Sequence, residues 1–447
     1  MRGRTEPAAE HERGPDPASD PGQDLDVVVV GAGPVGLLAG VLAHDAGLRV
    51  LVVDREPETC THSRAIGIHP PALRIFDTVS WGIGAGDNSG KDVGTLADVL
   101  VDAGVQVRRG HGFAGPDHPL GTLEFGLLDP PWNFILMLPQ WRTEALLQEA
   151  LVARGRNLLR RGVTVTGVRT EAASGPQARR IAIETLDASG KQATVRACFV
   201  LACDGKRSTV RDALGIAFSG EPYPHRYFMG DFTIDDGEAL PPVPQFDAAI
   251  FVAGGGLVES FPLEAGVRRW VVQRVPEGRG EGGDPAADDR DAAARIRALV
   301  GLVKRRTGVV LDPEGCRMIS AFGVERFLAD RVWQDGVILV GDSAHVVSPI
   351  GGQGMNLGWM HALEAVDAVA AVLRGEAPEG RVAREFEEQV RRRARQVMRR
   401  AEQNMTLGHR PPGGSALLQS VRAAIVRILL HSPLRRFIAR RFTMHGL

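Results

Sequence analysis

Short apolar runs, separated by glycine-rich turns and helical patterns, organise this chain. Residues 26–30 are almost entirely valine, a glycine turn follows, and an alanine- and leucine-rich stretch continues to about residue 46. A second apolar run covers residues 50–53. Strand, glycine turn, helix and second strand predict a βαβ unit. Further apolar runs at 199–203 and 337–340 predict two more buried strands, and the latter leads into a long helix beginning near Gly354.

The middle of the chain has a different pattern. Residues 81–138 alternate short apolar stretches with glycines, prolines and charges, and strand-like pieces lie at 227–232, 249–252 and 269–272. These pieces predict a separate mixed sheet. Residues 292–306 have the spacing of an amphipathic helix. No internal repeat is visible.

Composition narrows the function classes. The 447 residues carry a formal net charge of −1, so no global field would attract nucleic acid. No apolar run is long enough to cross a bilayer, and residues 1–24, rich in Pro, Gly and charge, predict a disordered lead-in. The four cysteines have no metal-ligand spacing. We expect a cytoplasmic enzyme with reduced thiols and no metal site.

The first chemical motif is the glycine turn itself. Gly31, Gly33 and Gly36 form a G-x-G-x-x-G pattern with Pro34 and Val35 between them. Asp54 ends the second strand, where the acidic residue of a dinucleotide-binding βαβ unit accepts from a ribose hydroxyl. The pattern therefore predicts a nucleotide diphosphate at the start of the helix.

Two more motifs follow predicted strands. Asp204 and Gly205 come directly after the run at 199–203, with Arg207 close behind. Gly341 and Asp342 open the glycine-rich run 341–358, which follows the strand at 337–340. Each motif places a carboxylate and glycine backbone at the end of a predicted strand. Three such motifs in one chain indicate a ligand-binding site rather than a chance match.

These motifs resemble the single-component FAD-dependent monooxygenases typified by para-hydroxybenzoate hydroxylase and the polyketide and phenol hydroxylases, from about residue 25 to about residue 374. The resemblance implies FAD as cofactor, with the glycine turn on its pyrophosphate, Asp54 on the adenosine ribose and Gln140 and Asp342 on the ribityl chain. It places Pro349 and the following loop against the isoalloxazine ring, and links Asp204-Gly205 to both FAD and NAD(P)H. The full set expected at the cofactor is Gly31, Gly33, Pro34, Val35, Gly36, Asp54, Arg55, Arg64, Gln140, Asp204, Gly205, Arg207, Gly341, Asp342, Gly352, Gly354, Met355 and Asn356.

The resemblance also implies an α/β fold. A Rossmann-like, glutathione-reductase-like FAD-binding domain would comprise residues 25–80, 138–218 and 313–374. A mixed-sheet substrate domain, 81–137 and 219–312, would be interleaved with it and cover the flavin. Residues 375–447 would form a C-terminal helical region.

The implied reaction is hydroxylation of a phenolic or polycyclic aromatic substrate by NADPH or NADH and O2, through a flavin C4a-hydroperoxide. Epoxidation, Baeyer–Villiger oxidation and isoprenoid reduction are possible on the same framework. A non-catalytic flavin- or metabolite-binding protein is the remaining alternative.

The sequence offers fewer candidates for catalytic residues than for cofactor-binding residues. Besides Pro349, we expect His225 or Tyr223 to line the substrate pocket, unless they belong to an exposed loop at the domain junction. His69 either approaches the flavin ring or opens a helix ahead of two prolines. We interpret His345 as a hydrogen-bonded structural histidine. Arg269 and Trp270 either contact the substrate or belong to an alternating strand with one face in water, and we favour the strand.

The C-terminal region has two interpretations. A charged helix is expected at 385–400, and Ser415 is placed to cap a further helix. The basic and apolar residues 434–442 fit a membrane-surface helix, but packing against the rest of the protein or against a second copy is favoured. The chain is expected to be a monomer or homodimer.

Overall fold

The structure, a computed structural model, describes residues 25–59, 65–82, 94–171, 178–234, 244–253, 256–264, 266–274, 291–408, 427, 432 and 434–446. The predicted lead-in, Arg64 and almost all of the predicted helix after Ser415 lie outside the described residues.

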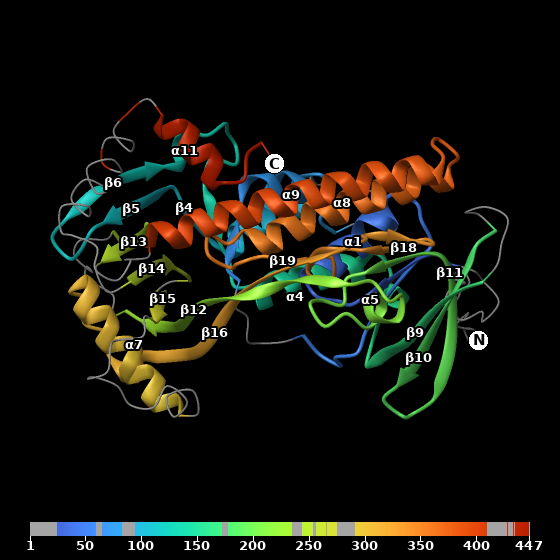
Figure 1. The fold of residues 1–447 in the computed structure, drawn as a ribbon, viewed down its shortest axis with the longest axis horizontal. Helices are drawn as coiled ribbons and strands as arrows, with labels where there is room; N and C mark the ends of the chain where they lie inside the picture. The colour runs from blue at the N-terminus through green and yellow to red at the C-terminus, as the bar shows by residue number, and fades with distance from the viewer. Residues whose placement is uncertain are drawn as a thin grey trace, which may run out of the picture.

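The first sheet is built on the βαβ unit (Figure 1). Its central strands pair in parallel, and four consecutive valines, residues 27–30, are buried on both faces, as in parallel sheets covered by helices. The strand order is β17 (Trp333–Gln334), β18 (Val337–Leu339), β11 (Gln192–Ala202), β1 (Leu25–Val30), β2 (Val50–Asp54), β8 (Leu159–Arg161), with β10 (Arg180–Asp187) paired to β11 and to β9 (Val163–Glu171).

The second sheet is almost wholly antiparallel. β16 pairs with the long strand β12, so residues 316–329, which we expected in the FAD-binding domain, belong to this sheet. The strand order is β19 (His345–Val346), β16 (Cys316–Ala329), β12 (Phe218–Thr233), β15 (Val267–Arg274), β14 (Gly256–Pro262), β13 (Ala248–Ala253), β5 (Arg109–Phe113), β6 (Pro119–Glu124). A third, small sheet has the order β3 (Gly67–Ile68), β7 (Ile135–Met137), β4 (Val105–Val107).

Helix α7 (Ala292–Thr307) covers one face of the second sheet, as the amphipathic pattern predicts. Its Leu299 and Val303 pack in one core cluster with Phe228 and Trp270. The expectation that one face of β15 lies in water is wrong: residues 267–273 are all buried, because α7 covers one face and the other borders an internal cavity.

The remaining helices frame the first sheet and the C-terminal side. The helix expected near Gly354 is α8, which runs beside the charged helix α9 (Figure 1). Within the described ranges, no helix combines the length and apolar character needed to cross a membrane. The helices are α1 (Pro34–Asp45), α2 (Pro70–Asp77), α3 (Leu96–Ala103), α4 (Gln140–Arg154), α5 (Thr209–Ala213), α8 (Gln353–Leu373), α9 (Glu379–Gly408) and α11 (Arg435–Phe442), with 3-10 turns at Phe125–Leu127, Arg156–Leu158, Pro313–Gly315 and Gly341–Ser343.

Candidate cofactor and substrate site

A cavity of about 1000 Å³ connects the two large sheets. At one end, the glycine-turn end, it is lined by the strand ends of the first sheet, including Gly31, Gly33 and Asp54. At the other, the sheet end, it is lined by one face of the second sheet, including Met229 and Val271. The motifs expected at a cofactor and the strands expected at a substrate therefore border one continuous space.

The glycine turn between β1 and α1 has no room for side chains inside the protein. Gly31 has φ +102°, and a Cβ there would clash with the carbonyl of Cys203. A Cβ on Gly36 would clash with the carbonyl of Gly31. A Cβ on Gly33, in contrast, would meet no atom within 4 Å, and Gly33 lines the cavity. The turn thus exposes bare backbone to a ligand, at the N-terminus of a helix that favours an anion.

Asp54 closes this turn at the end of β2. Its Oδ2 accepts a short hydrogen bond from the Ala32 N–H, and its Oδ1 accepts from the Glu56 N–H at 2.7 Å. The carboxylate is therefore fixed at the cavity wall, next to Arg55.

Asp204, at the end of β11, has spare hydrogen-bonding capacity. Its Oδ2 accepts from the Val210 N–H at 3.1 Å, whereas its buried Oδ1 has no partner among the described residues. Burial raises the pKa of this carboxyl, although hydrogen bonds from Ser208 and Val210 oppose the shift. Asp204, Gly205 and Arg207 all line the cavity.

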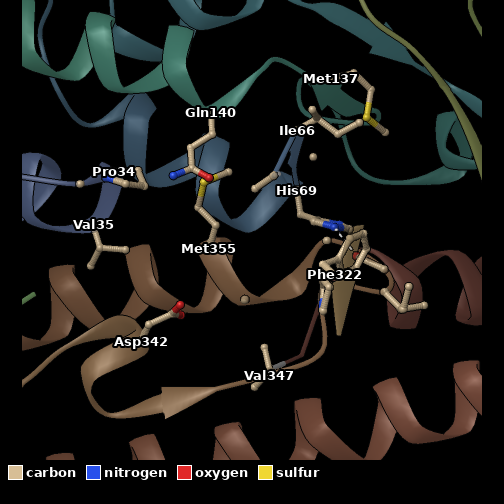
Figure 2. A pocket seen from close by; sticks show the side chains of 18 of the residues that line it. Pro34, Val35, Ile66, His69, Met137, Gln140, Phe322, Asp342, Val347 and Met355 are labelled. Carbon is tan, nitrogen blue, oxygen red and sulfur yellow. Dashed lines mark hydrogen bonds between the residues drawn. The ribbon is translucent and has the colours of Figure 1, made fainter. Parts of the chain in front are cut away.

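Asp342 faces the cavity from the turn after β18, in the same region as Gln140 and Met355 (Figure 2). Its carboxylate is open to the cavity, but the surrounding protein removes most of its hydration, which raises its pKa to about 6 against the opposing charge of Lys206. The Gln140 side chain donates to Glu144 Oε1 at 2.7 Å, leaving its carbonyl oxygen available to a ligand.

The loop before α8 is anchored to β3 and α2. Asn356 accepts from the His69 N–H at 2.8 Å and donates to the carbonyls of Gly67 and Gly352 at 2.9 and 2.8 Å. Pro349, Gly352, Gly354 and Met355 line the cavity, whereas Asn356 does not. Asn356 therefore positions the loop.

His69 opens α2, as one of its two sequence-based interpretations expected, and its side chain also lines the cavity. Its Nε2 lies 3.1 Å from the Gly351 carbonyl, which can only accept, so Nε2 carries the proton. Burial lowers its pKa to about 4 and keeps the ring neutral. Its Nδ1 is buried without a partner in the described part of the chain.

The sheet end is mainly apolar. Strand alternation sends Met229, Val271 and Phe322 toward the cavity, while their neighbours face α7. Helix α11 supplies Ile438 and Phe442 to the wall, and Phe442 stacks on Phe125 with centroids 5.8 Å apart.

Two basic residues of α11 are engaged in ion pairs within the protein. Arg436 and Arg440 both pair with Asp129, at 2.8 and 3.0 Å.

Two charged side chains on the second sheet also reach the sheet end. Arg269 is held by Asp231 through two hydrogen bonds of 2.6 and 2.7 Å. Glu259, on β14, is 6% exposed, and burial raises its pKa to about 7.

His225 and Tyr223 require a correction, because neither lines the cavity. The Tyr223 hydroxyl donates to Glu402 of α9 at 2.9 Å, and His225 Nδ1 lies 3.1 Å from Gln273 Nε2. Both belong to the irregular part of β12, where its pairing with β16 shifts between residues 222 and 226, so the regular strand alternation does not extend to them.

Other expected residues are placed as follows. Gly36 and Gly341 do not line the cavity but permit close packing: Gly341 has φ +70° and lies against Val35. His345 is a buried structural histidine, as expected, with Nε2 2.7 Å from His361 Nδ1. In the described residues, no group of three His, Cys, Asp or Glu side chains could hold a metal ion.

The sequence-based prediction missed the sheet-end residues, among them Glu259, Phe442 and His111. The sequence pattern could have indicated Glu259. In a strand it points to the same side as Leu257 and Phe261, so it is a charged residue on an otherwise apolar face.

Comparison with known proteins agrees with this geometry. Residues 24–401 match a family model described as FAD binding domain, which covers most of the chain. The chain belongs to the FAD binding domain family. The resemblance to single-component FAD-dependent aromatic hydroxylases is therefore confirmed at the level of the family.

Individual relatives of this FAD binding domain chain are monooxygenases by name. It is 30% identical over 364 residues to the rifampicin monooxygenase of Streptomyces venezuelae, covering 80% of this chain and 66% of that one. It is 27% identical over 371 residues to the anhydrotetracycline monooxygenase of Streptomyces rimosus, covering 79% and 64%. The chain thus spans about two thirds of the length of these curated relatives.

A solved structure supports the fold. The p-nitrophenol 4-monooxygenase of Pseudomonas putida superposes with a TM-score of 0.77 at 23% identity, covering 95% of this chain and 98% of that one. The α/β, Rossmann-type FAD-binding fold is therefore confirmed.

The residues present fit FAD. The glycine turn leaves free space only toward the cavity, and the buried Oδ1 of Asp204 lacks a partner in the described part of the protein. The turn, Asp54, Gln140 and Asp342 provide donors and acceptors for a diphosphate, a ribose and a polyol chain along one wall.

Proposed function

We propose that the protein is an FAD-dependent monooxygenase that uses NAD(P)H and O2 to hydroxylate a phenolic or polycyclic aromatic substrate. The observation that carries this proposal is the continuity of the cavity, which joins the glycine-turn end to an apolar sheet end without a dividing wall. An aromatic compound at the sheet end would then lie beside the redox-active ring. The monooxygenase names of the relatives support the same reaction class.

Bound FAD would supply the redox chemistry, taking two electrons from NAD(P)H and activating O2. The overall reaction is aromatic C–H plus NAD(P)H, H⁺ and O2, giving aromatic C–OH, NAD(P)⁺ and water. One oxygen atom enters the new C–O bond, and the other leaves as water.

In this proposal, the protein contributes binding and orientation. N–H groups of the turn at Gly33 hold the diphosphate, Asp54 accepts from the ribose, and Asp342 accepts from the polyol chain. The neutral His69 donates to the Gly351 carbonyl and thereby fixes the loop that contains Pro349.

The sheet end contributes by excluding water. Met229, Val271 and Phe322 present apolar surface to the cavity, and α11 adds Phe442. A dry chamber favours oxygen transfer to the substrate over loss of reducing equivalents as hydrogen peroxide. We place the NAD(P)H contact near Asp204, Gly205 and Arg207, at the glycine-turn end.

The test is NAD(P)H oxidation by the purified flavoprotein under labelled oxygen gas, with and without a panel of phenols and polycyclic aromatics. The proposal expects substrate-stimulated oxidation and one labelled oxygen atom in the product. Saturation of a double bond without label would indicate a reductase. Full FAD occupancy with no stimulated oxidation by any compound would contradict the proposal and favour a binding protein.

A further inference from the structure

The polar group that stands out at the sheet end is Glu259. Its strand register places it in a cross-strand row with Ile250 on β13, Val271 on β15 and Met229 on β12. All four residues line the cavity. A carboxyl group is therefore set into an apolar row that faces the ligand space.

No partner among the described residues accounts for the burial of Glu259. No hydrogen bond or ion pair from its carboxyl group occurs among the described residues, although 94% of the residue is buried (6% exposed). Burial is the cause of its raised pKa, and no nearby cation opposes the shift. Glu259 interacts electrostatically with Tyr227, whose buried hydroxyl also lacks a partner in the described residues.

The neighbouring arginine does not provide a counter-charge. Arg269 lines the cavity, but Asp231 binds it through two short hydrogen bonds. The other arginines of the cavity wall, Arg55 and Arg207, are at the glycine-turn end beside Asp54 and Asp204. Among the described residues that line the sheet end, the basic side chains Arg269 and His111 are already bound to Asp231 and Asp247, so neither is placed to balance an anionic ligand beside Glu259.

An unpartnered carboxyl group in an apolar wall is costly to the fold, because its hydration is lost without replacement. A ligand that donates a hydrogen bond would replace that hydration. A ligand carboxylate would instead meet a second negative charge in a site of low dielectric constant.

We propose that Glu259 is the specificity-determining residue of the sheet end: it accepts a hydrogen bond from a hydroxyl of an uncharged aromatic substrate and excludes aromatic carboxylates. This inference rests on the proposed function, and it narrows the substrate class to neutral hydroxyarenes.

Three probes separate the two parts of the inference. 2-Naphthol carries the donor, 2-methoxynaphthalene lacks it, and 6-hydroxy-2-naphthoate keeps the donor but adds a carboxylate. Dissociation constants are measured at pH 8 by perturbation of the flavin absorption spectrum. The wild-type protein should bind 2-naphthol about tenfold more tightly than either of the other probes, the effect of one hydrogen bond to a charged group or of one like-charge contact.

Two variants of Glu259 give opposite signatures. Glu259→Leu should remove the preference for 2-naphthol over 2-methoxynaphthalene. Glu259→Gln retains an acceptor oxygen but no charge, so it should keep part of that preference while binding 6-hydroxy-2-naphthoate about tenfold better than the wild type. Met229→Leu, a volume-conserving change in the same row, is the control and should change binding of all three probes alike. Flavin content confirms that each variant is folded.

The inference is overturned if Glu259→Leu keeps the wild-type ratios, or if the wild type binds the carboxylate as tightly as 2-naphthol or binds none of the probes. Its failure is distinguishable from that of the proposed function. Labelled product with unchanged ratios in Glu259→Leu would refute only the role of Glu259. The expected ratios without oxygen incorporation would refute only the hydroxylase.

Discussion

Replacing Glu259 with leucine should stabilise the protein, and the gain should depend on pH. Burial raises the pKa of this carboxyl from 4.5 to about 7. The folded state therefore holds the Glu259 proton more tightly than the unfolded chain, and unfolding releases a proton between these two pH values. The contribution of Glu259 to stability consequently falls as the pH rises from 4.5 to 7 and stays at the lower level above that.

The size of the stability difference follows from the unfolded and folded pKa values of Glu259. Each pKa unit corresponds to about 1.4 kcal/mol, so the ionised carboxyl costs about 3 kcal/mol above neutral pH and almost nothing at low pH. Leucine has a similar volume and removes this cost. Thermal unfolding of wild type and Glu259→Leu, without aromatic ligand, should therefore show a midpoint difference that is large at pH 8 and small at pH 4.5.

Glu184→Gln on the exposed face of β10 controls for the general effect of pH on the chain. A difference between wild type and Glu259→Leu that is equal at both pH values would show that the carboxyl is not desolvated as argued. A Glu259→Leu variant less stable than wild type at pH 8 would show that the carboxyl has a favourable partner, which would refute the reasoning.

Three further predictions concern other parts of the cavity. Asp342→Ala and Gly33→Val should both yield folded protein without bound flavin, whereas Gly36→Val should fail to fold because its side chain meets the Gly31 carbonyl. Flavin absorbance measures cofactor content, and circular dichroism measures folding. An Asp342→Ala or Gly33→Val protein that is yellow and fully loaded with flavin would refute the assignment. Arg269→Ala should lower the free energy of unfolding by roughly 3–5 kcal/mol, because it leaves Asp231 without its counter-charge. The double variant Arg269→Leu/Asp231→Leu should lose much less, as measured by urea unfolding. Equal losses in the two variants would mean that the pair is not coupled. Phe442→Ala should open the sheet end to water and raise the amount of hydrogen peroxide formed per NAD(P)H consumed, which a peroxidase assay measures. An unchanged ratio of hydrogen peroxide to NAD(P)H would mean that α11 does not seal the cavity.

The residues that line the glycine-turn end of the cavity were predictable because their determinants are local. Gly31, Gly33 and Asp54 lie on one strand–turn–helix–strand unit, and Asp204 and Asp342 each follow directly after a buried strand. Parallel strands bring such ends to one edge of a sheet, so their proximity requires no knowledge of distant pairing. Gln140 lines the cavity as the resemblance implied.

The residues that line the sheet end of the cavity were not predictable, because they are single positions on several antiparallel strands. Glu259 meets Val271 and Met229 only through the register of β14, β15 and β12, which the sequence does not fix. Tyr223 illustrates the same limit, since it lies in the irregular part of β12 and its hydroxyl donates to α9. Gly31, Gly33 and Asp54 therefore line the cavity where the local pattern places them, whereas Tyr223 and His225 do not line it.

Helix α11 contributes to the cavity from outside the part of the chain that the family model matches. The family match ends at residue 401, whereas Ile438 and Phe442 come from residues beyond it. Changes in this short C-terminal segment can therefore alter the size and shape of the chamber without affecting the glycine turn or Asp342. Substitutions at Ile438 and Phe442 can thus reshape the chamber while every motif at the glycine-turn end stays unchanged.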